Sequence, residues 1–207
     1  MICALAVMAV VDAAFAESIC LQDFRAGTDI KPVPGEKGGK VTEASIAKEK
    51  AKYGDSSAKL SFDFEGTQGL AQVNAKIEFA PKGDVSSIKA DKLIAWIWMD
   101  GHRRVLDNFI AEFQDAKGEW FCYDDKARML LTWGGCWHPQ ELSLCKPDHT
   151  YGYEGKGKGV FQWPLVKARI GVAKQWDAAP IDDTMRKSAG TVYIGALDAE
   201  QVSLPLS

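Results

Sequence analysis

A strict alternation of apolar and polar residues, repeated in several segments, is the feature that most limits how this chain can fold. In AKLSFDFEG (residues 58–66) every second residue is Leu or Phe, and those between them are Ser, Asp or Glu. AQVNAKIEFAP (residues 71–81) alternates in the same way. Successive side chains of a strand point to opposite faces, so this period of two predicts antiparallel strands with one buried face.

Other segments extend this pattern over the chain. DKLIAWIWMDG (residues 91–101) is apolar on both faces and TVYIGAL (residues 191–197) is β-branched and aromatic, so both are expected to be strands. Only TEASIAKEKAKYG (residues 42–54) is rich in helix formers, and it predicts a short helix or a charged loop. Many short strands separated by turn residues indicate an all-β fold, a sandwich or barrel, in a single domain over residues 17–207.

The first sixteen residues have the character of a targeting segment. MICALAVMAVVDAAFA (residues 1–16) is an apolar run that ends in Ala14-Phe15-Ala16, an A-x-A cleavage pattern. It predicts a signal peptide and a secreted or periplasmic protein, with a buried N-terminal helix or strand as the alternative. The apolar run is too short to span a bilayer, so no membrane span is expected.

Export would allow disulfides to form. Outside the expected signal peptide, four cysteines allow three pairings: Cys20, Cys122, Cys136 and Cys145. The short spacing between Cys136 and Cys145 favours a disulfide between those two. The Cys and His residues do not have the spacing of a zinc site.

Charge and composition exclude two classes of partner. The net charge is −3 and no basic stripe is present, so a nucleic-acid partner is not expected. The glycine-rich YEGKGKGVFQWP (residues 153–164) matches no phosphate-binding motif. It predicts a surface loop that ends in a strand; the alternative is that the loop flanks a binding site, because Tyr151, Tyr153 and Trp163 are close to it in the sequence.

Six segments together resemble a known family. LQDFRAG, DSSAKLSFDFEG, KLIAWIWMDGH, FIAEFQDAKGEWFCYD, GGCWHPQELSL and GTVYIGAL follow one another in the order seen in galactose-binding-like jelly rolls. These are the carbohydrate-binding modules of secreted glycoside hydrolases. The resemblance implies an antiparallel β-sandwich (jelly roll) that binds sugar on an exposed sheet face or at loop tips. It also implies a polysaccharide or oligosaccharide partner and, in a longer parent chain, a catalytic domain.

The same resemblance raises the question of a structural calcium ion. Many members hold one, with acidic residues from the first and last strands among its oxygen ligands. Asp23 matches the first position. Gly195 and Ala196 stand where the family often has two aspartates, and the next acid is Asp198. The sequence therefore commits to no metal site and to no certain cofactor.

The segment FIAEFQDAKGEWFCYD (residues 109–124) is expected to form a hairpin in which the adjacent aromatics Trp120 and Phe121 point to opposite faces of one strand. Asp115-Ala116-Lys117-Gly118 fits a type I turn with a G1 bulge, in which Gly118 is left-handed. That turn predicts the pairs Gln114 with Trp120, Phe113 with Phe121 and Glu112 with Cys122. Phe121 would then enter the core, and Trp120 would share the outer face with Glu112 and Gln114.

An aromatic sheet face is expected to bind the sugar. Leu93, Ala95, Ile97 and Met99 would join the core, which leaves Trp96 and Trp98 on the other face of their strand. If that strand neighbours the hairpin in one sheet, the face would hold these candidate binding residues: Trp96, Trp98, Glu112, Gln114 and Trp120. Flat aromatics stack on sugar rings, and carboxylates and amides bond to hydroxyl groups. The alternative is that a loop covers the tryptophans as a second small core.

Three functions therefore remain open at this stage. A non-catalytic carbohydrate-binding domain comes first, because no nucleophile elbow or Ser/His/Asp set is visible. A β-sandwich polysaccharide hydrolase or lyase is the second, since carboxylates share strand faces. The third is a structural accessory domain of a larger glycoside hydrolase that binds nothing.

Overall fold

The computed structural model describes residues 17–33, 35, 39–67, 73–83, 90–99, 107–124, 135–152, 159–174 and 189–201. Those residues form two six-stranded sheets and contain no helix. Every strand pair is antiparallel. The predicted all-β antiparallel sandwich is therefore confirmed, and the jelly-roll arrangement is consistent with it. The expected signal peptide lies outside the described residues.

Sheet A contains the first and last strands of the chain. Its strands run in the order β3-β4-β12-β6-β9, and β1 also pairs with β12. The bounds are β1 (Glu17–Gln22), β3 (Lys40–Ala47), β4 (Ser57–Asp63), β6 (Lys92–Met99), β9 (Trp137–Ser143) and β12 (Ala189–Gln201).

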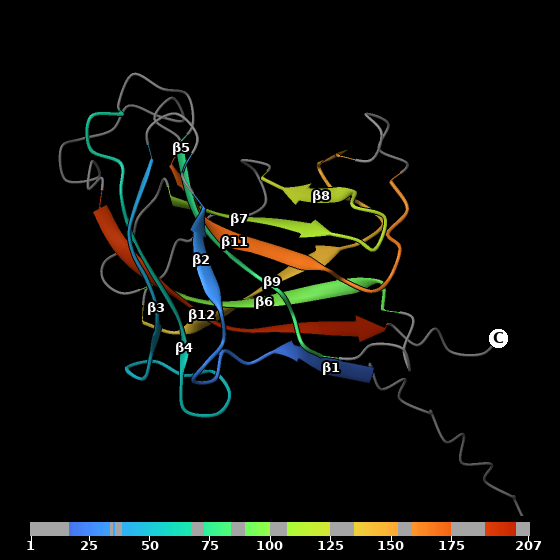
Figure 1. Cartoon of the computed structure of the whole chain (residues 1–207), viewed down its shortest axis with the longest axis horizontal. Helices are drawn as coiled ribbons and strands as arrows, with labels where there is room; N and C mark the ends of the chain where they lie inside the picture. The colour runs from blue at the N-terminus through green and yellow to red at the C-terminus, as the bar shows by residue number, and fades with distance from the viewer. Residues whose placement is uncertain are drawn as a thin grey trace, which may run out of the picture.

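Sheet B carries the hairpin. Its order is β10-β8-β7-β11-β5-β2. The bounds are β2 (Ile30–Val33), β5 (Val73–Phe79), β7 (Asp107–Gln114), β8 (Trp120–Tyr123), β10 (His149–Tyr151) and β11 (Lys167–Lys174). In Figure 1, β6, β7, β8, β11 and β12 run along the long axis, whereas β2, β3 and β4 run steeply across it.

The core lies between the sheets and is built by the alternating segments. Leu60, Phe62 and Phe64 are buried in it, as are Val73, Ala75, Ile77 and Phe79 of β5. The inward residues of β6 and of the hairpin join the same cluster: Leu93, Ala95, Ile97, Met99, Phe109, Ala111, Phe113, Phe121 and Tyr123. The period-two prediction of the buried faces is confirmed at each of these positions.

The segment rich in helix formers is a strand. Residues 40–47 form β3, which pairs with β4 from Lys40 to Ala47. Val41, Ala44 and Ile46 pack against the core. The prediction of a helix or charged loop was wrong for these residues, because pairing to β4 and burial outweigh a weak helix propensity.

The expected Cys136–Cys145 disulfide is also wrong. All four described cysteines are free thiols. The two residues flank β9, a fully extended segment. Strand β9 alone spans six steps of about 3.3 Å, or about 20 Å, whereas a disulfide needs Cα atoms about 7 Å apart or less.

Among the residues that the structure describes, no helix is long and apolar enough to cross a membrane.

Candidate functional site

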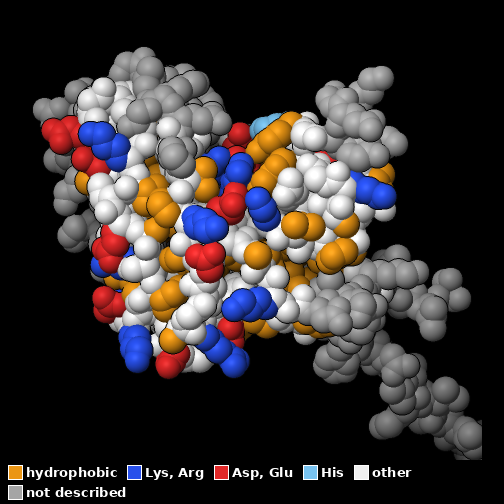
Figure 2. Space-filling model, in the orientation of Figure 1, with side chains coloured by type: hydrophobic (Ala, Val, Ile, Leu, Met, Phe, Trp, Pro, Cys, Tyr) orange, Lys and Arg blue, Asp and Glu red, His pale blue; other side chains and the backbone are white. Residues whose placement is uncertain are grey.

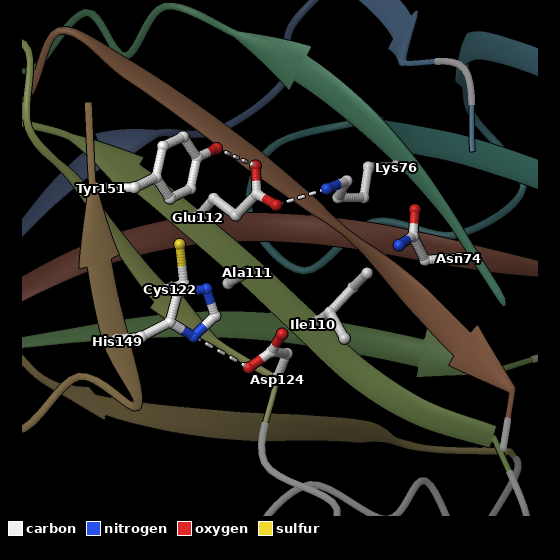
Figure 3. Close-up of a pocket in the computed structure, with 9 residues that line it drawn as sticks. All are labelled: Asn74, Lys76, Ile110, Ala111, Glu112, Cys122, Asp124, His149 and Tyr151. Atoms are coloured by element: carbon white, nitrogen blue, oxygen red, sulfur yellow. Dashed lines mark hydrogen bonds and ion pairs between the residues drawn. The ribbon is translucent and has the colours of Figure 1, made fainter. Parts of the chain in front are cut away.

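The outer face of sheet B contains a hollow of about 140 Å³. Figure 3 shows its lining, with Tyr151 and His149 at one end and Asn74 at the other. Nine residues from β5, β7, β8, β10 and the start of the next loop line it: Asn74, Lys76, Ile110, Ala111, Glu112, Cys122, Asp124, His149 and Tyr151. The hollow is the candidate site because it gathers polar and aromatic groups on one open sheet surface.

The absence of a side chain at Gly171 shapes this surface. Gly171 pairs with Lys76 on one side and with Ile110 on the other, in the middle of β11. A Cβ there would lie 1.9 Å from the backbone oxygen of Ala75, so only glycine fits. The Lys76 side chain can therefore cross β11 and form an ion pair with Glu112 on β7.

Glu112 is the centre of the polar network in the hollow. It accepts hydrogen bonds from Lys76 Nζ, from Tyr151 Oη at 3.4 Å and from Arg169 Nη1 at 3.3 Å. Arg169 also donates its Nε to Glu78 at 2.8 Å. Figure 2 shows the result, with blue and red side chains interspersed over this face. The cations of this network are thus already paired with carboxylates.

The ion pair with Arg169 lowers the pKa of Glu78. Burial alone would raise the pKa of its carboxyl group, but the hydrogen bond and charge of Arg169 outweigh burial and hold it below its ordinary value. Glu78 is therefore ionised throughout the neutral range.

Tyr151 is the exposed aromatic residue of the hollow. It is 40% exposed, and its ring stacks on Trp120 with a centroid distance of 6.1 Å and an interplanar angle of 16°. Burial and the nearby charge of Glu112 raise its pKa, so the phenol stays protonated and can donate a hydrogen bond. The ring of Tyr151 is therefore packed against Trp120 while part of the side chain remains exposed to solvent.

The rim beside Tyr151 carries a second polar pair. His149 Nδ1 lies 3.5 Å from Asp124 Oδ1. Burial raises the pKa of Asp124, while His149 opposes that rise and Asp148 adds to it. Cys122 lies beneath, and burial followed by the charges of Glu112 and Asp124 raises the pKa of its thiol. A thiol so hard to ionise is a poor nucleophile.

The hairpin prediction is confirmed in its register. Glu112 pairs with Cys122, Phe113 with Phe121 and Gln114 with Trp120, and Gly118 has a φ of 84°. Glu112, Gln114 and Trp120 therefore lie together on the outer face of sheet B. Gln114 donates its Nε2 to the Gly118 carbonyl at 3.3 Å.

Trp120 faces outward but is not open to solvent. It is only 7% exposed, because Tyr151 stacks beside it and Arg169 Cζ lies 4.1 Å from its ring centroid. The expectation that this indole offers an exposed face for sugar, as part of a shared aromatic surface, is not supported by this burial.

Trp96 and Trp98 lie elsewhere. Their strand β6 pairs with β12 and β9 in sheet A, so it is not a neighbour of the hairpin. Their side chains point away from the core on the outer face of sheet A, opposite the hollow. The expectation of three indoles on one surface was wrong, because the order of strands places them on the two outer faces of the sandwich.

The segment after β3 covers these two tryptophans. Lys50 Nζ lies 4.6 Å from the ring centroid of Trp98, and Lys52 Nζ lies 3.5 Å from that of Trp96. Trp137 packs edge-on against Trp98 at 5.7 Å. The alternative expectation, a second small core under a covering segment, describes this face.

Several residues of the hollow were missed by sequence reasoning. Asn74 and Lys76 are on the polar side of an alternating strand, a position that ordinarily indicates only solvent exposure. Arg169 does not line the hollow but bonds to Glu112 within it, and it lies in a segment that was not identified as a strand. Tyr151 was noted only as a neighbour of the glycine-rich loop. Only the pairing of β10, β8, β7, β11 and β5 brings these residues together.

The described acidic residues do not by themselves form a calcium site of the kind that the family resemblance implies. Asp23 is paired with Arg25. The Oδ2 of Asp198 accepts hydrogen bonds from Trp96 Nε1 at 2.9 Å and Tyr53 Oη at 3.1 Å, and its Oδ1 is buried without a hydrogen-bond partner in the described part of the chain. Calcium takes six to eight oxygen ligands, and among the described residues no group of three or more His, Cys, Asp or Glu could hold a metal.

Comparison with known proteins shows the fold. The family 11 carbohydrate-binding module from Clostridium thermocellum, in complex with a β-1,3-1,4-mixed-linked tetrasaccharide, matches 88% of this chain and 94% of its own, with a TM-score of 0.53 and 13% identity. The solution structure of CtCBM11 matches 94% of this chain and 99% of its own chain, with a TM-score of 0.51 and 15% identity. These similarities establish that the chain has the β-sandwich fold of such modules.

A longer enzyme contains the same fold. The β-1,2-glucanase from Parabacteroides distasonis matches 86% of this chain with a TM-score of 0.50 and 12% identity, over 24% of its own length. No protein-family model matches the sequence. No curated protein matches it either.

Proposed function

We propose that this protein is a carbohydrate-binding module that holds a polysaccharide on the outer face of sheet B, beside Tyr151. The observation that carries the proposal is an exposed aromatic ring, fixed by stacking on Trp120, at one end of a hollow lined with hydrogen-bonding groups. The similarity in fold to carbohydrate-binding modules supports it. Export of the protein belongs to the same proposal.

The chemistry of the hollow suits a sugar ring. A pyranose has an apolar C–H face and a hydroxyl edge, so a flat aromatic ring can stack on the first. The hydroxyl edge would meet His149, Glu112 and Asn74 along the length of the hollow. Each of these carries polar atoms that can bond to hydroxyl groups.

A neutral β-glucan is the first ligand to test. Lys76 and Arg169 are both paired with carboxylates, so neither offers an unpaired charge to a uronate. The family 11 module is described in complex with a β-1,3-1,4-mixed-linked tetrasaccharide. We therefore propose mixed-linkage β-glucan as the probe.

Catalysis on the same face is the second candidate function. The hollow is lined by groups that serve as acids and bases in glycan cleavage: His149, Tyr151, Glu112 and Asp124.

The glucanase in which this fold occupies only part of a longer chain supports a further proposal, a catalytic domain in a longer parent chain. A structural domain that binds nothing is the third outcome.

A pair of tyrosine variants tests the proposal. Tyr151→Ala is expected to weaken retention of the protein by mixed-linkage β-glucan in affinity electrophoresis by about tenfold or more, because the stacking ring is lost. Tyr53→Ala is the matched control, since Tyr53 is 39% exposed and bonds to Asp198 of sheet A, away from the hollow. It is expected to leave retention unchanged.

Three results would contradict the proposal. Equal retention of both variants would remove Tyr151 from the site. Release of reducing or unsaturated sugar ends by the parent protein would show an enzyme instead. The absence of retention on glucans, mannans, xylans and uronates alike would favour the structural domain.

A further inference from the structure

A second hollow, the lysine hollow, lies on the outer face of sheet B beside β2. It has a volume of about 240 Å³. Five charged residues from β2, β5, β11 and the adjoining loops are in its lining: Asp29, Lys31, Glu78, Lys82 and Lys167. Strands β11, β5 and β2 follow one another in sheet B, as Figure 1 shows. The lysine hollow is therefore on the same sheet face as the proposed sugar site.

A row of paired residues connects the two hollows. Glu78 of the lysine hollow pairs with Arg169, and Arg169 pairs on its other side with Glu112 of the first hollow. Neighbouring strands lie about 4.8 Å apart, so the Cα atoms of Glu78 and Glu112 are separated by about 10 Å. A polysaccharide that crosses the strands of sheet B can therefore reach both hollows.

The ammonium groups of the lysine hollow are exposed and loosely paired. The side chains of Lys31 and Lys167 are 69% and 45% exposed, and their carboxylate partners lie at 3.6 Å and 3.7 Å. Glu78, the partner of Lys167, is bonded more closely by Arg169 at 2.8 Å. Lys82 is exposed and forms no ion pair among the described residues. These ammonium groups are therefore free to meet a ligand.

Positive charge is in excess around the lysine hollow. Its charged residues and their ion-pair partners in the described part of the chain comprise five cations and three carboxylates: Lys31, Lys76, Lys82, Lys167, Arg169, Asp29, Glu78 and Glu112. A concave surface with an excess of one charge concentrates ions of the opposite sign. The lysine hollow is thus suited to an anionic group.

We propose that the lysine hollow binds the acidic group of a sugar residue, a carboxylate or a sulfate, on the same polysaccharide chain that contacts Tyr151. This inference rests on the proposed carbohydrate-binding function. A neutral residue stacks on Tyr151 in the first hollow, and an acidic residue further along the chain meets Lys82 and its neighbours. Lysine suits this role because its ammonium group is a compact charge on a flexible stem, which can follow an anion whose position varies along a polymer.

Carboxymethylated mixed-linkage β-glucan is the probe, and the neutral glucan is its reference. Both polymers have the same backbone, so they offer the same sugar residues to the first hollow. The parent protein is expected to bind the carboxymethylated glucan about fivefold more tightly at low ionic strength, measured by titration calorimetry, as one or two exposed ion pairs allow. This gain in affinity should shrink at about 1 M salt, where the Debye length is about 3 Å.

A sulfated glucan of equal charge density is the second arm of the experiment. It offers the same negative charge on a different group, so the larger of the two gains identifies whether the lysine hollow prefers a carboxylate or a sulfate.

Two variants should shift the gain in opposite directions. Lys82→Gln removes the unpaired ammonium group, so it should reduce the gain and leave affinity for the neutral glucan unchanged. Asp29→Asn removes the carboxylate beside Lys31, so it should increase the gain. Both side chains are exposed, so both variants are expected to keep the unfolding midpoint of the parent.

Lys40→Gln is the matched control. Like Lys82, Lys40 is exposed and forms no ion pair among the residues that the structure describes. Its neighbour Gly39 packs against the backbone of Asn74, at the end of β5 opposite Lys82. This variant removes the same charge away from the lysine hollow, so it should keep the gain.

The outcomes separate this inference from the proposed function. A parent protein that binds the neutral and the acidic glucans equally would overturn the acidic subsite and leave the proposed function intact. A loss of the gain in Lys40→Gln as large as that in Lys82→Gln would also overturn the subsite, because net charge alone would then explain the binding. A parent protein that binds none of these polymers would overturn the proposed function itself.

Discussion

Trp120 and Phe121 are neighbours in the chain but pack on opposite faces of sheet B. Phe121 is fully buried in the core between the sheets. Trp120 is nearly as buried on the outer face, where Tyr151 and Arg169 contact its ring. Both residues are therefore packed, but only Trp120 supports the proposed site.

Alanine variants of these neighbours should both destabilise the protein. Each loses a large buried ring, which costs about 3–5 kcal/mol in a core and is expected near the lower end for Trp120, which lies on the outer face of sheet B. Trp120→Ala should also weaken glucan affinity, because Tyr151 loses the ring on which it stacks. Denaturant unfolding and affinity electrophoresis measure the two effects.

Trp120→Phe is the matched control for that prediction. It keeps an aromatic ring under Tyr151, so it should retain most of the affinity. A Trp120→Ala variant that binds as well as the parent would show that Tyr151 does not depend on this stack.

Glu78 gives a prediction for the pH dependence of stability. Its pKa is lowered in the folded protein, so its ion pair with Arg169 stabilises the folded state above the unfolded pKa of about 4.3. That contribution, about 1 kcal/mol for a partly exposed pair, is lost as the pH falls through the folded pKa. The difference in unfolding free energy between the parent and Glu78→Gln should therefore be present at pH 7 and shrink on acidification. If the difference in unfolding free energy grew on acidification instead, the pKa of Glu78 would be raised in the folded protein and the prediction would be wrong.

The hairpin β7–β8 shows how a turn sets the register of a whole element. Asp115 Oδ1 accepts hydrogen bonds from the backbone N–H groups of Lys117 at 2.8 Å and Glu119 at 2.9 Å. Its Oδ2 accepts a third from Gln162 at 3.1 Å. These bonds hold the turn that places Glu112 and Trp120 on the outer face, and all but the last are local in sequence.

Strand β11 depends on glycine at one point. Gly171→Ala would place a methyl group against the backbone oxygen of Ala75, so β5 and β11 would have to separate. Overpacking of this kind typically costs about 1–3 kcal/mol, and here the obstacle is rigid backbone. Thermal unfolding should show a clear drop in the midpoint. An unchanged midpoint would mean that the two strands part easily.

At the scale of the whole molecule, the two outer faces differ in what lies over them. The face of sheet A is packed by Trp137 and by Lys50 and Lys52 from the segment after β3. The face of sheet B keeps a hollow bordered by Tyr151. Both outer faces carry tryptophan, and the proposed site is on the outer face of sheet B.

Calcium should not change the stability of the whole molecule. A ligand that binds only the folded state raises the unfolding midpoint in proportion to its affinity. Among the described residues no group of three or more His, Cys, Asp or Glu could hold a metal, so these residues alone predict equal midpoints in excess calcium and in excess EDTA. A higher midpoint with calcium would reveal a site that these residues do not explain.

Much of the local structure could be predicted from the sequence. The alternation around Phe62 and Ile77 identified the buried faces, and the turn at Gly118 identified the hairpin register. Both signals depend on the geometry of one strand or one turn, so neighbouring residues are sufficient to specify them.

The composition of the site depended on tertiary structure. Whether Trp96 lies beside Trp120 depends on the order of strands, and whether either indole is open depends on which distant segment packs over it. The hollow itself combines residues from four paired strands and one loop, from Asn74 to Tyr151. Periodicity indicates which way a side chain points but not what it meets, because strand order and covering segments are decided by long-range packing that no single segment encodes.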